Sequence, residues 1–373
     1  MIEANKNMSK KIKILAETLV IILISILLIF GFLQIAQAPL KETIDTFIFQ
    51  KIQEKNSDNH LPAIEKKPTE FIFGGDVMLS RQVNSRMTKY QNYSWPFAKI
   101  KDFLRTADLT IINLESPFAV ASDYFVPTGS FSFKADPKAI SGLLESGIDI
   151  VSLANNHTLN QGKKGLTDTF EILNENNIKY IGAGNNDNEA HLGEIVEING
   201  NKFGFLAYAY PDDYSIANEK SAGIAGMEIE KMREDVQRIS EEGAIAIVII
   251  HAGIEYVTEP NGQQINFAHA AIDAGAEAVI GHHPHWPQTF EFYQNKPIIY
   301  SLGNLIFDQM WSEETRQGLL AKMSWQDGWQ NIELIPIKIH DYGQAEIITD
   351  EVEKKSILKK IDAPEDGKIL KND

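Results

Sequence analysis

Hydrophobic and polar residues alternate along the chain from Glu70 onwards in a pattern typical of strands followed by helices. Short apolar runs bounded by turn residues predict buried strands at Phe71–Gly74, Leu109–Asn113, Ile148–Ala154, Ala244–Ile250, Ala276–Gly281 and Ile298–Ser301. Longer stretches with an apolar stripe predict helices at Pro137–Ser146, Gly162–Asn176, Met227–Glu242 and Gln264–Ala274. Strands that alternate with helices of this length predict an α/β domain with a mostly parallel sheet.

Two hairpins interrupt this alternation. Asn199-Gly200 lies between the alternating runs Glu194–Ile198 and Lys202–Tyr208, and this dipeptide is a strong signal for a two-residue turn. Phe290–Tyr293 and Pro297–Ser301 predict the second hairpin.

The chain after Gln317 is rich in strands, which predicts an additional sheet rather than another strand–helix unit. A four-layer α/β/β/α sandwich accommodates the parallel units, the hairpins and these late strands. We place this domain at residues 70–340 and a C-terminal extension at 341–373.

An apolar stretch near the N-terminus predicts a membrane anchor. Leu19–Phe32 is uncharged and the apolar character extends to about Ile35, near the minimum of about 17 residues for a spanning helix. Lysines before this stretch favour a cytoplasmic tail with the bulk of the chain outside the cell membrane: Lys6, Lys10, Lys11 and Lys13. We expect a tail at 1–13, an uncleaved single-pass anchor at 14–37 and a stalk at 38–69.

Two alternatives stay open in this part of the chain. Ala36-Gln37-Ala38 has the A-x-A form of a signal-peptidase site, although Pro39 directly after it disfavours cleavage. The segment that ends at Pro68 has no sustained period. It is either a stalk with one short helix at Lys41–Glu54 or an element that caps the main domain.

Composition excludes several kinds of site and partner. The 373 residues include no Cys, which excludes disulfides, thiolate-held iron–sulfur clusters and a cysteine nucleophile. Lys and Arg number 35 against 51 Asp and Glu, so the net charge is −16. Nucleic acid is a poor partner for so acidic a chain, because phosphate neutralisation supplies much of that affinity. Binding of an anionic substrate would require a local source of positive charge, such as a bound metal ion.

Side chains that bind metals gather where the predicted strands end. Asp76 follows the first strand, Asn113-Leu114-Glu115 the second, and Asn155-Asn156-His157 the third. The fourth and fifth strands end at His251, His282, His283 and His285. Ligands in open α/β sheets bind at the carboxyl ends of strands. Carboxylate, amide and imidazole groups without a thiolate favour Mn²⁺, Fe²⁺ or Zn²⁺.

Taken singly, most of these residues also have an ordinary structural explanation. Asp76 after two glycines suits a turn or helix cap, and His251 at the end of an apolar strand suits a buried, hydrogen-bonded histidine. Three imidazoles within residues 282–285 have few structural uses. The convergence of the whole set on strand ends therefore favours a functional site.

Six segments in order resemble the motif series of the bacterial capsule-synthesis CapA family: Gly74–Arg81, Asn113–Pro117, Leu153–His157, His251–Tyr256, Gly281–His285 and Tyr300–Gln309. The resemblance spans roughly residues 70–310 and implies the fold of the metallo-dependent phosphatases. Its PgsA-like members belong to poly-γ-glutamate synthesis systems. It therefore implies an anionic polymer such as poly-γ-glutamate, the membrane and membrane-bound synthase or export subunits as partners.

The resemblance to the wider phosphatase superfamily implies a set of metal ligands: Asp76, Glu115, Asn156, His251, His283 and His285. We expect Asp76 with His285 at one position. A second, weaker position would use Asn156, His251 and His283. Glu115 would bridge the two positions. Met78 stands where the superfamily has the histidine of its Asp-x-His motif. One or two divalent ions, Mn, Fe or Zn, are expected.

The same resemblance implies catalytic roles for His157, which would assist a leaving group, and for Arg81, which would hold an anionic group. A structural ion pair between Arg81 and a nearby acid is the alternative. Substrate contacts are expected from Arg81, Asn113, Asn155, Glu255, Tyr256, His282 and Asn304.

Two functions use these residues. One is a metal-dependent hydrolase that cleaves a phosphoester or remodels an exported γ-glutamyl polymer. The other is a non-catalytic scaffold that binds the polymer and gathers synthase partners at the membrane.

Overall fold

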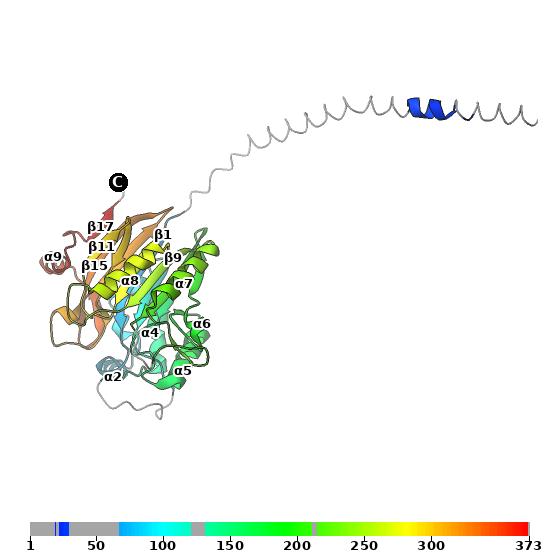
Figure 1. Ribbon diagram of the computed structural model, residues 1–373. Coiled ribbons are helices and arrows are strands. Elements are labelled where there is room, and N and C mark those ends of the chain that lie inside the picture. Colours follow the sequence, from blue (N-terminus) through cyan, green and yellow to red (C-terminus); the bar gives the residue numbers. More distant parts are fainter. Residues whose placement is uncertain (1–18, 20–21, 30–66, 121–130, 211–214, 372–373) are drawn as a thin grey trace, which may run out of the picture. The chain divides into compact units, whose positions relative to one another are not determined.

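The computed structural model describes residues 19, 22–29, 67–120, 131–210 and 215–371 (Figure 1). The chain divides into two units, Met1–Glu65 and Lys66–Asp373. In the first unit, residues 19 and 22–29 are helical. Within the described residues, no helix combines the length and the apolar character of a membrane span. The predicted tail, most of the predicted anchor and the stalk helix at 41–54 lie outside the described residues, so the anchor stays a prediction.

The second unit contains a nine-stranded sheet (Figure 1). β1 to β4 are parallel neighbours, as the alternation of strands and helices predicts. On its other side β1 pairs with β14, and the order continues through β15 to β16. The strands are β1 (Thr69–Val77), β2 (Leu109–Leu114), β3 (Ile150–Ser152), β4 (Lys179–Ile181), β13 (Asn304–Ile306), β14 (Gln317–Trp325), β15 (Trp329–His340), β16 (Gln344–Ile347) and β17 (Lys368–Lys371).

The late strands extend this sheet, so the prediction of an additional sheet after Gln317 is wrong. β14 runs antiparallel to β1, with Phe71 opposite Met323 and Phe73 opposite Ala321. β16 and β17 both pair with β15, so strands of the expected C-terminal extension belong to the same sheet. The physical reason is that β2 occupies only one edge of β1, and the other edge still offers unpaired backbone groups.

A six-stranded sheet forms the other half of the unit, in the order β11-β12-β10-β9-β7-β6. Its strands are β6 (Glu194–Ile198), β7 (Asn201–Ala209), β9 (Ile245–His251), β10 (Ala278–His282), β11 (Phe290–Tyr293) and β12 (Lys296–Ile299). Both predicted hairpins are confirmed, as β6–β7 and β11–β12. Asn199 and Gly200 have φ of 49° and 75°, the positive values that a type I′ turn requires. A small pair joins β5 (Ala183–Gly184) to β8 (Gly223–Ile224).

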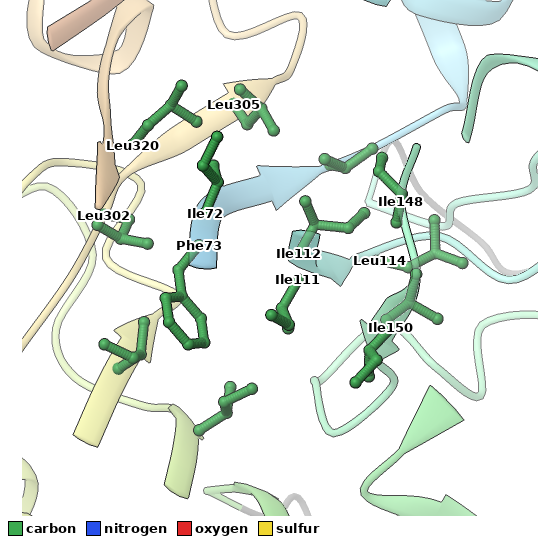
Figure 2. Packing of buried hydrophobic residues seen from close by; sticks show 14 of the residues in the cluster. Ile72, Phe73, Ile111, Ile112, Leu114, Ile148, Ile150, Leu302, Leu305 and Leu320 are labelled. Atoms are coloured by element: carbon green, nitrogen blue, oxygen red, sulfur yellow. The ribbon is translucent and has the colours of Figure 1, made fainter. Parts of the chain in front are cut away.

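The two sheets pack face to face through aromatic and aliphatic side chains. Phe71 of β1 meets Phe203 of β7 with ring centroids 4.8 Å apart. Figure 2 shows Phe73 and Ile111 on one side of β1 and β2, and Ile72 and Ile112 on the opposite side, as strand geometry requires. Both sets are buried. The nine-stranded sheet therefore buries both of its faces here.

Helices cover the outer faces of the sheets. Met232 and Val236 of α7 and Phe267 of α8 pack against Ala246 and Val248 of β9 in one cluster. α2, α4, α5 and α9 contribute to the larger cluster that contains the nine-stranded sheet. The helices are α2 (Arg81–Tyr90), α3 (Lys101–Leu104), α4 (Ile140–Glu145), α5 (Gly162–Glu175), α6 (Asp187–Ala190), α7 (Ile229–Glu241), α8 (Gly262–Asp273) and α9 (Glu351–Lys360).

The four predicted helices are present, with one difference in kind. Pro137–Ala139 form a 3₁₀ turn that leads into α4, because Asp136 caps that turn and Pro137 begins it. A further helix, α2, was not predicted; Val83 and Met87 are its buried residues, at a spacing of four. The observed architecture is an α/β fold of two packed sheets with helices outside them.

Candidate metal centre at the carboxyl ends of the strands

The fold brings the predicted strand-end residues of both sheets together. In the nine-stranded sheet, Asp76 of β1 lies beside Asn113 of β2. In the six-stranded sheet, His251 ends β9 beside His282, which ends β10. One ligand atom each from Asp76, Glu115 and His251 lies within 4.8 Å of the others, and all three residues are buried. The carboxyl ends of strands from two sheets thus form a single cluster.

Imidazoles surround Asp76. The Nδ1 atoms of His285, His282 and His251 lie 3.4, 3.6 and 4.0 Å from its carboxylate oxygens. Burial alone would raise the pKa of Asp76, but the hydrogen bond of His285 and the electrostatic effects of His251 and His282 outweigh burial. The pKa of Asp76 therefore lies well below its usual range. Asp76 is an anion at neutral pH.

Glu115 is a buried carboxyl group that is only partly hydrogen-bonded. Its Oε2 accepts a hydrogen bond from Asn113 Nδ2 at 3.1 Å, whereas its buried Oε1 has no hydrogen-bond partner among the described residues. Burial, followed by the charge of Asp76 and its hydrogen bond and then by the charge of Glu255, holds the pKa of Glu115 well above its usual range. An unpaired buried carboxylate oxygen is costly. A divalent ion bound by carboxylates and imidazoles would satisfy it, so these residues fit such an ion.

His157 points an unprotonated nitrogen at that same oxygen. Asn160 Oδ1 accepts the backbone N–H of Phe133 at 2.8 Å and contacts His157 Nδ1 at 2.9 Å. Because an amide oxygen only accepts, the hydrogen-bond network assigns the ring proton to Nδ1. Nε2 is left with a lone pair, 3.7 Å from Glu115 Oε1. Burial is the main cause that lowers the pKa of His157 to about 4.

His285 is held like His157, with an amide oxygen at Nδ1 and with Nε2 directed at Glu115. Asn304 Nδ2 donates to the carbonyl of Thr315, so its Oδ1 faces His285 Nδ1 at 3.0 Å. Both acceptors near Nδ1, Asn304 Oδ1 and the Asp76 carboxylate, place the ring proton there. His285 Nε2 therefore offers its lone pair 3.9 Å from Glu115 Oε1. Two imidazole lone pairs thus face one unpaired carboxylate oxygen.

A second group of predicted ligands gathers around His251. Its Nε2 lies 3.0 Å from Asn156 Oδ1 and 3.2 Å from His283 Nδ1. Burial is the main cause that lowers the pKa of both histidines, well below the usual range for His251. Neutral imidazoles are the form that binds metal. This grouping is the one expected for a second ion position.

The loop that presents the last two histidines has an unusual backbone. His283 and His285 have φ of 98° and 58°, in the left-handed region that residues with a side chain seldom adopt. The backbone N–H of His283 contacts Asp76 Oδ2 at 3.3 Å. Strained conformations of this kind persist where the surrounding structure enforces them, and they cluster at functional sites.

Four residues expected to contact substrate lie below the surface: Asn113, Asn155, His282 and Asn304. Asn113 and Asn155 are fully buried in a hydrogen-bond network, and Asn304 holds His285. His282 faces Asp76, and within the part of the chain that the structure describes its Nδ1 has no hydrogen-bond partner. Each of these four side chains lies against another residue of the site, which it can orient.

Arg81 forms a structural ion pair, the predicted alternative to a substrate contact. Its guanidinium binds the carboxylate of Asp308 and lies over the rings of Phe133 and Phe307, 4.8 and 5.7 Å from their centroids. The backbone N–H of Gln82 also donates to Asp308. A quarter of the Arg81 side chain stays exposed. Asp308 and Asn160 were not among the predicted site residues, although both lie in or beside the motif segments.

Tyr256 and Glu255 lie at the accessible rim of the centre. The Tyr256 hydroxyl accepts a hydrogen bond from Gln309, whose Oε1 accepts one from Asn304. Burial, together with the charge and hydrogen bond of Glu255, raises the pKa of Tyr256, so the phenol stays neutral. The ring packs edge-on against Trp311, which is 61% exposed. These residues are the ones placed to meet a molecule that approaches the buried cluster.

Comparisons with known proteins agree with the motif series. The family model described as bacterial capsule synthesis protein PGA_cap matches residues 70–309. The capsule biosynthesis protein CapA of Bacillus anthracis is 27% identical over 77% of this chain and 71% of its own length. The PGA biosynthesis protein CapA of Bacillus subtilis is 27% identical over 80% of each chain. A solved putative 5'-nucleotidase from Staphylococcus aureus is 14% identical with a TM-score of 0.45, covering 76% of this chain and 55% of that one.

Proposed function

Because the chain belongs to the bacterial capsule synthesis protein PGA_cap family, we propose that it is a component of poly-γ-glutamate capsule synthesis or export. We further propose that an N-terminal anchor holds it in the cell membrane with its main domain outside. The names of the relatives from two Bacillus species support the first part. The uncharged stretch Leu19–Phe32 and the lysines before it support the second.

The domain would have the metallo-dependent phosphatase type of α/β/β/α sandwich, and its centre would bind a divalent ion. Asp76, Glu115 and His285 would hold one ion, and Asn156, His251 and His283 a second. When bound, the ion supplies positive charge and Lewis acidity to an anionic ligand. The unpaired Oε1 of Glu115, faced by two imidazole lone pairs, is the observation that supports this proposal most strongly.

The ligand at this centre would be a carboxylate-bearing polymer. With a net charge of −16, the chain as a whole repels such a polymer, so attraction has to be local. The partly exposed Arg81 and the neutral phenol of Tyr256 can contact carboxylate groups at the rim. Binding of polymer beside membrane-bound synthase or export subunits is the scaffold form of this function.

Hydrolysis of a γ-glutamyl or phosphoester bond is the second candidate, and the tautomer of His157 favours it. The Nδ1 proton is committed to Asn160, so Nε2 can accept a proton from an attacking water. The same nitrogen would then return that proton to the leaving group. The predicted role of His157 is to donate a proton to the leaving group. In this tautomer Nε2 carries no proton, so it must first accept one.

One experiment separates these functions. The purified full chain in detergent would be mixed with poly-γ-glutamate, with Mn²⁺ or with EDTA, and binding and chain length would be measured together. Binding that requires Mn²⁺ without shortening of the polymer supports the scaffold function, and shortening supports the hydrolase. His283→Ala serves as the control that lacks a metal ligand. Absence of binding and of cleavage in the Mn²⁺ sample would contradict both functions.

The membrane topology has its own test. Protease added to intact spheroplasts should digest the main domain and spare the short N-terminal tail. A mature chain that begins at Pro39, identified by mass spectrometry, would show that the segment is cleaved instead of serving as an anchor.

A further inference from the structure

The side-chain amide of Asn113 lies among the atoms that would hold a cation. Its Nδ2 is 2.8 Å from Asp76 Oδ1, 3.1 Å from Glu115 Oε2 and 3.2 Å from His251 Nδ1. These three residues are the ones whose ligand atoms lie within 4.8 Å of one another. Asn113 is fully buried. Two N–H groups of an amide thus stand where two carboxylates and an imidazole converge.

Hydrogen bonds from the backbone determine the orientation of this amide. Asn155 Oδ1 accepts the backbone N–H of His157 at 3.1 Å, so its Nδ2 is the atom that donates to the Leu114 carbonyl at 2.9 Å. The same Nδ2 donates to Asn113 Oδ1 at 3.1 Å. With Oδ1 occupied in this way, Asn113 Nδ2 must face the carboxylates. The nitrogen, not the oxygen, therefore occupies the centre of the triad.

An ion in the triad and the amide nitrogen exclude each other. Asp76 Oδ1 and His251 Nδ1 are 4.0 Å apart. An ion bound to both at about 2.0–2.2 Å would lie close to the line between them. Asn113 Nδ2 is within 3.2 Å of both atoms, and its hydrogens point at the oxygen that would ligate the ion. The ion would meet a donor hydrogen instead of a lone pair.

We propose that the Asn113 carboxamide is an internal substitute for a cation in the Asp76–Glu115–His251 triad, and that a divalent transition-metal ion enters the triad only by displacing it. The inference rests on the proposed function, because it concerns the same centre. The triad lies at Nδ1 of His251, whereas the ion position with Asn156 and His283 lies at Nε2 of the same ring. Asn113 contacts only Oε2 of Glu115, so Oε1 and His285 Nε2 stay open to an ion. The position that uses Glu115 Oε1 and His285 can therefore fill without movement of the amide.

The test compares metal binding by the full-length wild-type chain in detergent with that of Asn113→Ala and Asn113→Ser. Mn²⁺ and Zn²⁺ are the probes, with ions per chain measured by mass spectrometry of the metals and affinity by calorimetry. Each variant should bind one more ion per chain than wild type, or bind it at least about tenfold more tightly, because displacing one hydrogen bond to a charged group costs about that factor. Gln264→Ala, which removes an equally buried amide that bonds Gln288 outside the centre, should show no gain.

Weaker or unchanged metal binding in a folded Asn113 variant would overturn the inference, since the amide would then support the ligands instead of replacing the ion. If both variants fail to fold, crystals of the wild type are soaked in Mn²⁺. An anomalous peak inside the triad beside an unmoved Asn113 overturns the inference. A peak with the Asn113 amide moved away from the triad supports the inference. Polymer binding by wild type is measured in parallel. A gain of metal without any polymer binding supports this inference and contradicts only the proposed function.

Discussion

Two buried clusters in this protein pair histidines with carboxylates, and they differ in how completely their polar atoms are satisfied. Beneath α7, His191 Nδ1 contacts Asp235 Oδ2 at 2.7 Å, and Tyr208 donates to the same oxygen at 2.9 Å. Arg238 donates to the carbonyl of His191 at 2.8 Å. Among the described residues, five buried side-chain atoms lack a hydrogen-bond partner, and none belongs to this cluster.

The strand-end cluster contains two of those five atoms, Glu115 Oε1 and His282 Nδ1. Residue types and burial are similar in both places, so neither distinguishes a structural network from a binding centre. The difference lies in the unpaired atoms. A satisfied network stabilises the fold, whereas an unsatisfied one costs free energy that a ligand can recover. Substitutions should therefore affect folding in the first cluster and metal binding in the second.

The largest expected effect on stability is that of Asp235→Ala. The substitution leaves His191 and Tyr208 without their shared acceptor inside the fold. Removal of one partner from a buried ionic network costs about 3–5 kcal/mol, which urea unfolding would measure. Metal content should stay unchanged. Loss of metal without loss of stability would show that this cluster, too, serves metal binding and not the stability of the fold.

His283→Ala should have the largest effect on metal binding. Its ring lies 3.2 Å from His251, so its removal takes an imidazole out of the second ion position. Loss of such a group weakens metal binding by about tenfold to a hundredfold or more. Unfolding of the metal-free protein should change little. A variant that keeps wild-type metal content and affinity would show that His283 is not a ligand.

Glu115→Gln should have opposite effects on the two properties. The amide is neutral and can donate to Asp76, so the metal-free protein should gain about 1–3 kcal/mol of stability. Metal affinity should fall, because a charged ligand is lost. Thermal unfolding with and without Mn²⁺ measures both. If the variant were less stable without metal, Glu115 would not be the unsatisfied group that the structure indicates.

The pH dependence sharpens this prediction. The folded-state pKa of Glu115 lies above its ordinary value of 4.5, so the stability it contributes is present below that pH and is lost as pH rises through the raised pKa. The pH dependence of the stability that His157 contributes has the opposite sign, because its pKa is lowered from 6.5 to about 4. This stability is present above pH 6.5 and is lost as the pH falls towards about 4. The gain from Glu115→Gln should thus be small near pH 4.5 and increase with rising pH. Metal release should also require a pH below the ordinary histidine range.

The smallest effect concerns the ion pair of Arg81 and Asp308. Asp308→Ala and Arg81→Ala should each lower stability by about 1 kcal/mol, the scale of a partly exposed ion pair. Arg81→Ala should also weaken polymer binding, whereas Asp308→Ala retains the positive charge and should not. Equal polymer affinity in both variants would restrict Arg81 to its structural role.

Local features of the sequence determined much of the fold. The strand β9, the helices α7 and α8 and the turn at Asn199-Gly200 follow from apolar periodicity and backbone preference, which act over a few residues. The residues of the centre were also predictable, because polar side chains at strand ends converge in any parallel α/β sheet. The grouping of His251, His283 and Asn156 is the one that the resemblance to the wider phosphatase superfamily implies.

The hydrogen bonds that those residues make depend on contacts between segments that are distant in sequence. The pairing of β14 with β1 depends on which sheet edge is open, and Arg81 meets Asp308 across 227 positions of the chain. The proton of His157 and the orientation of Asn113 are set by backbone groups of other loops. Periodicity specifies which side of a strand a residue faces, but the direction of a donor depends on neighbours distant in sequence.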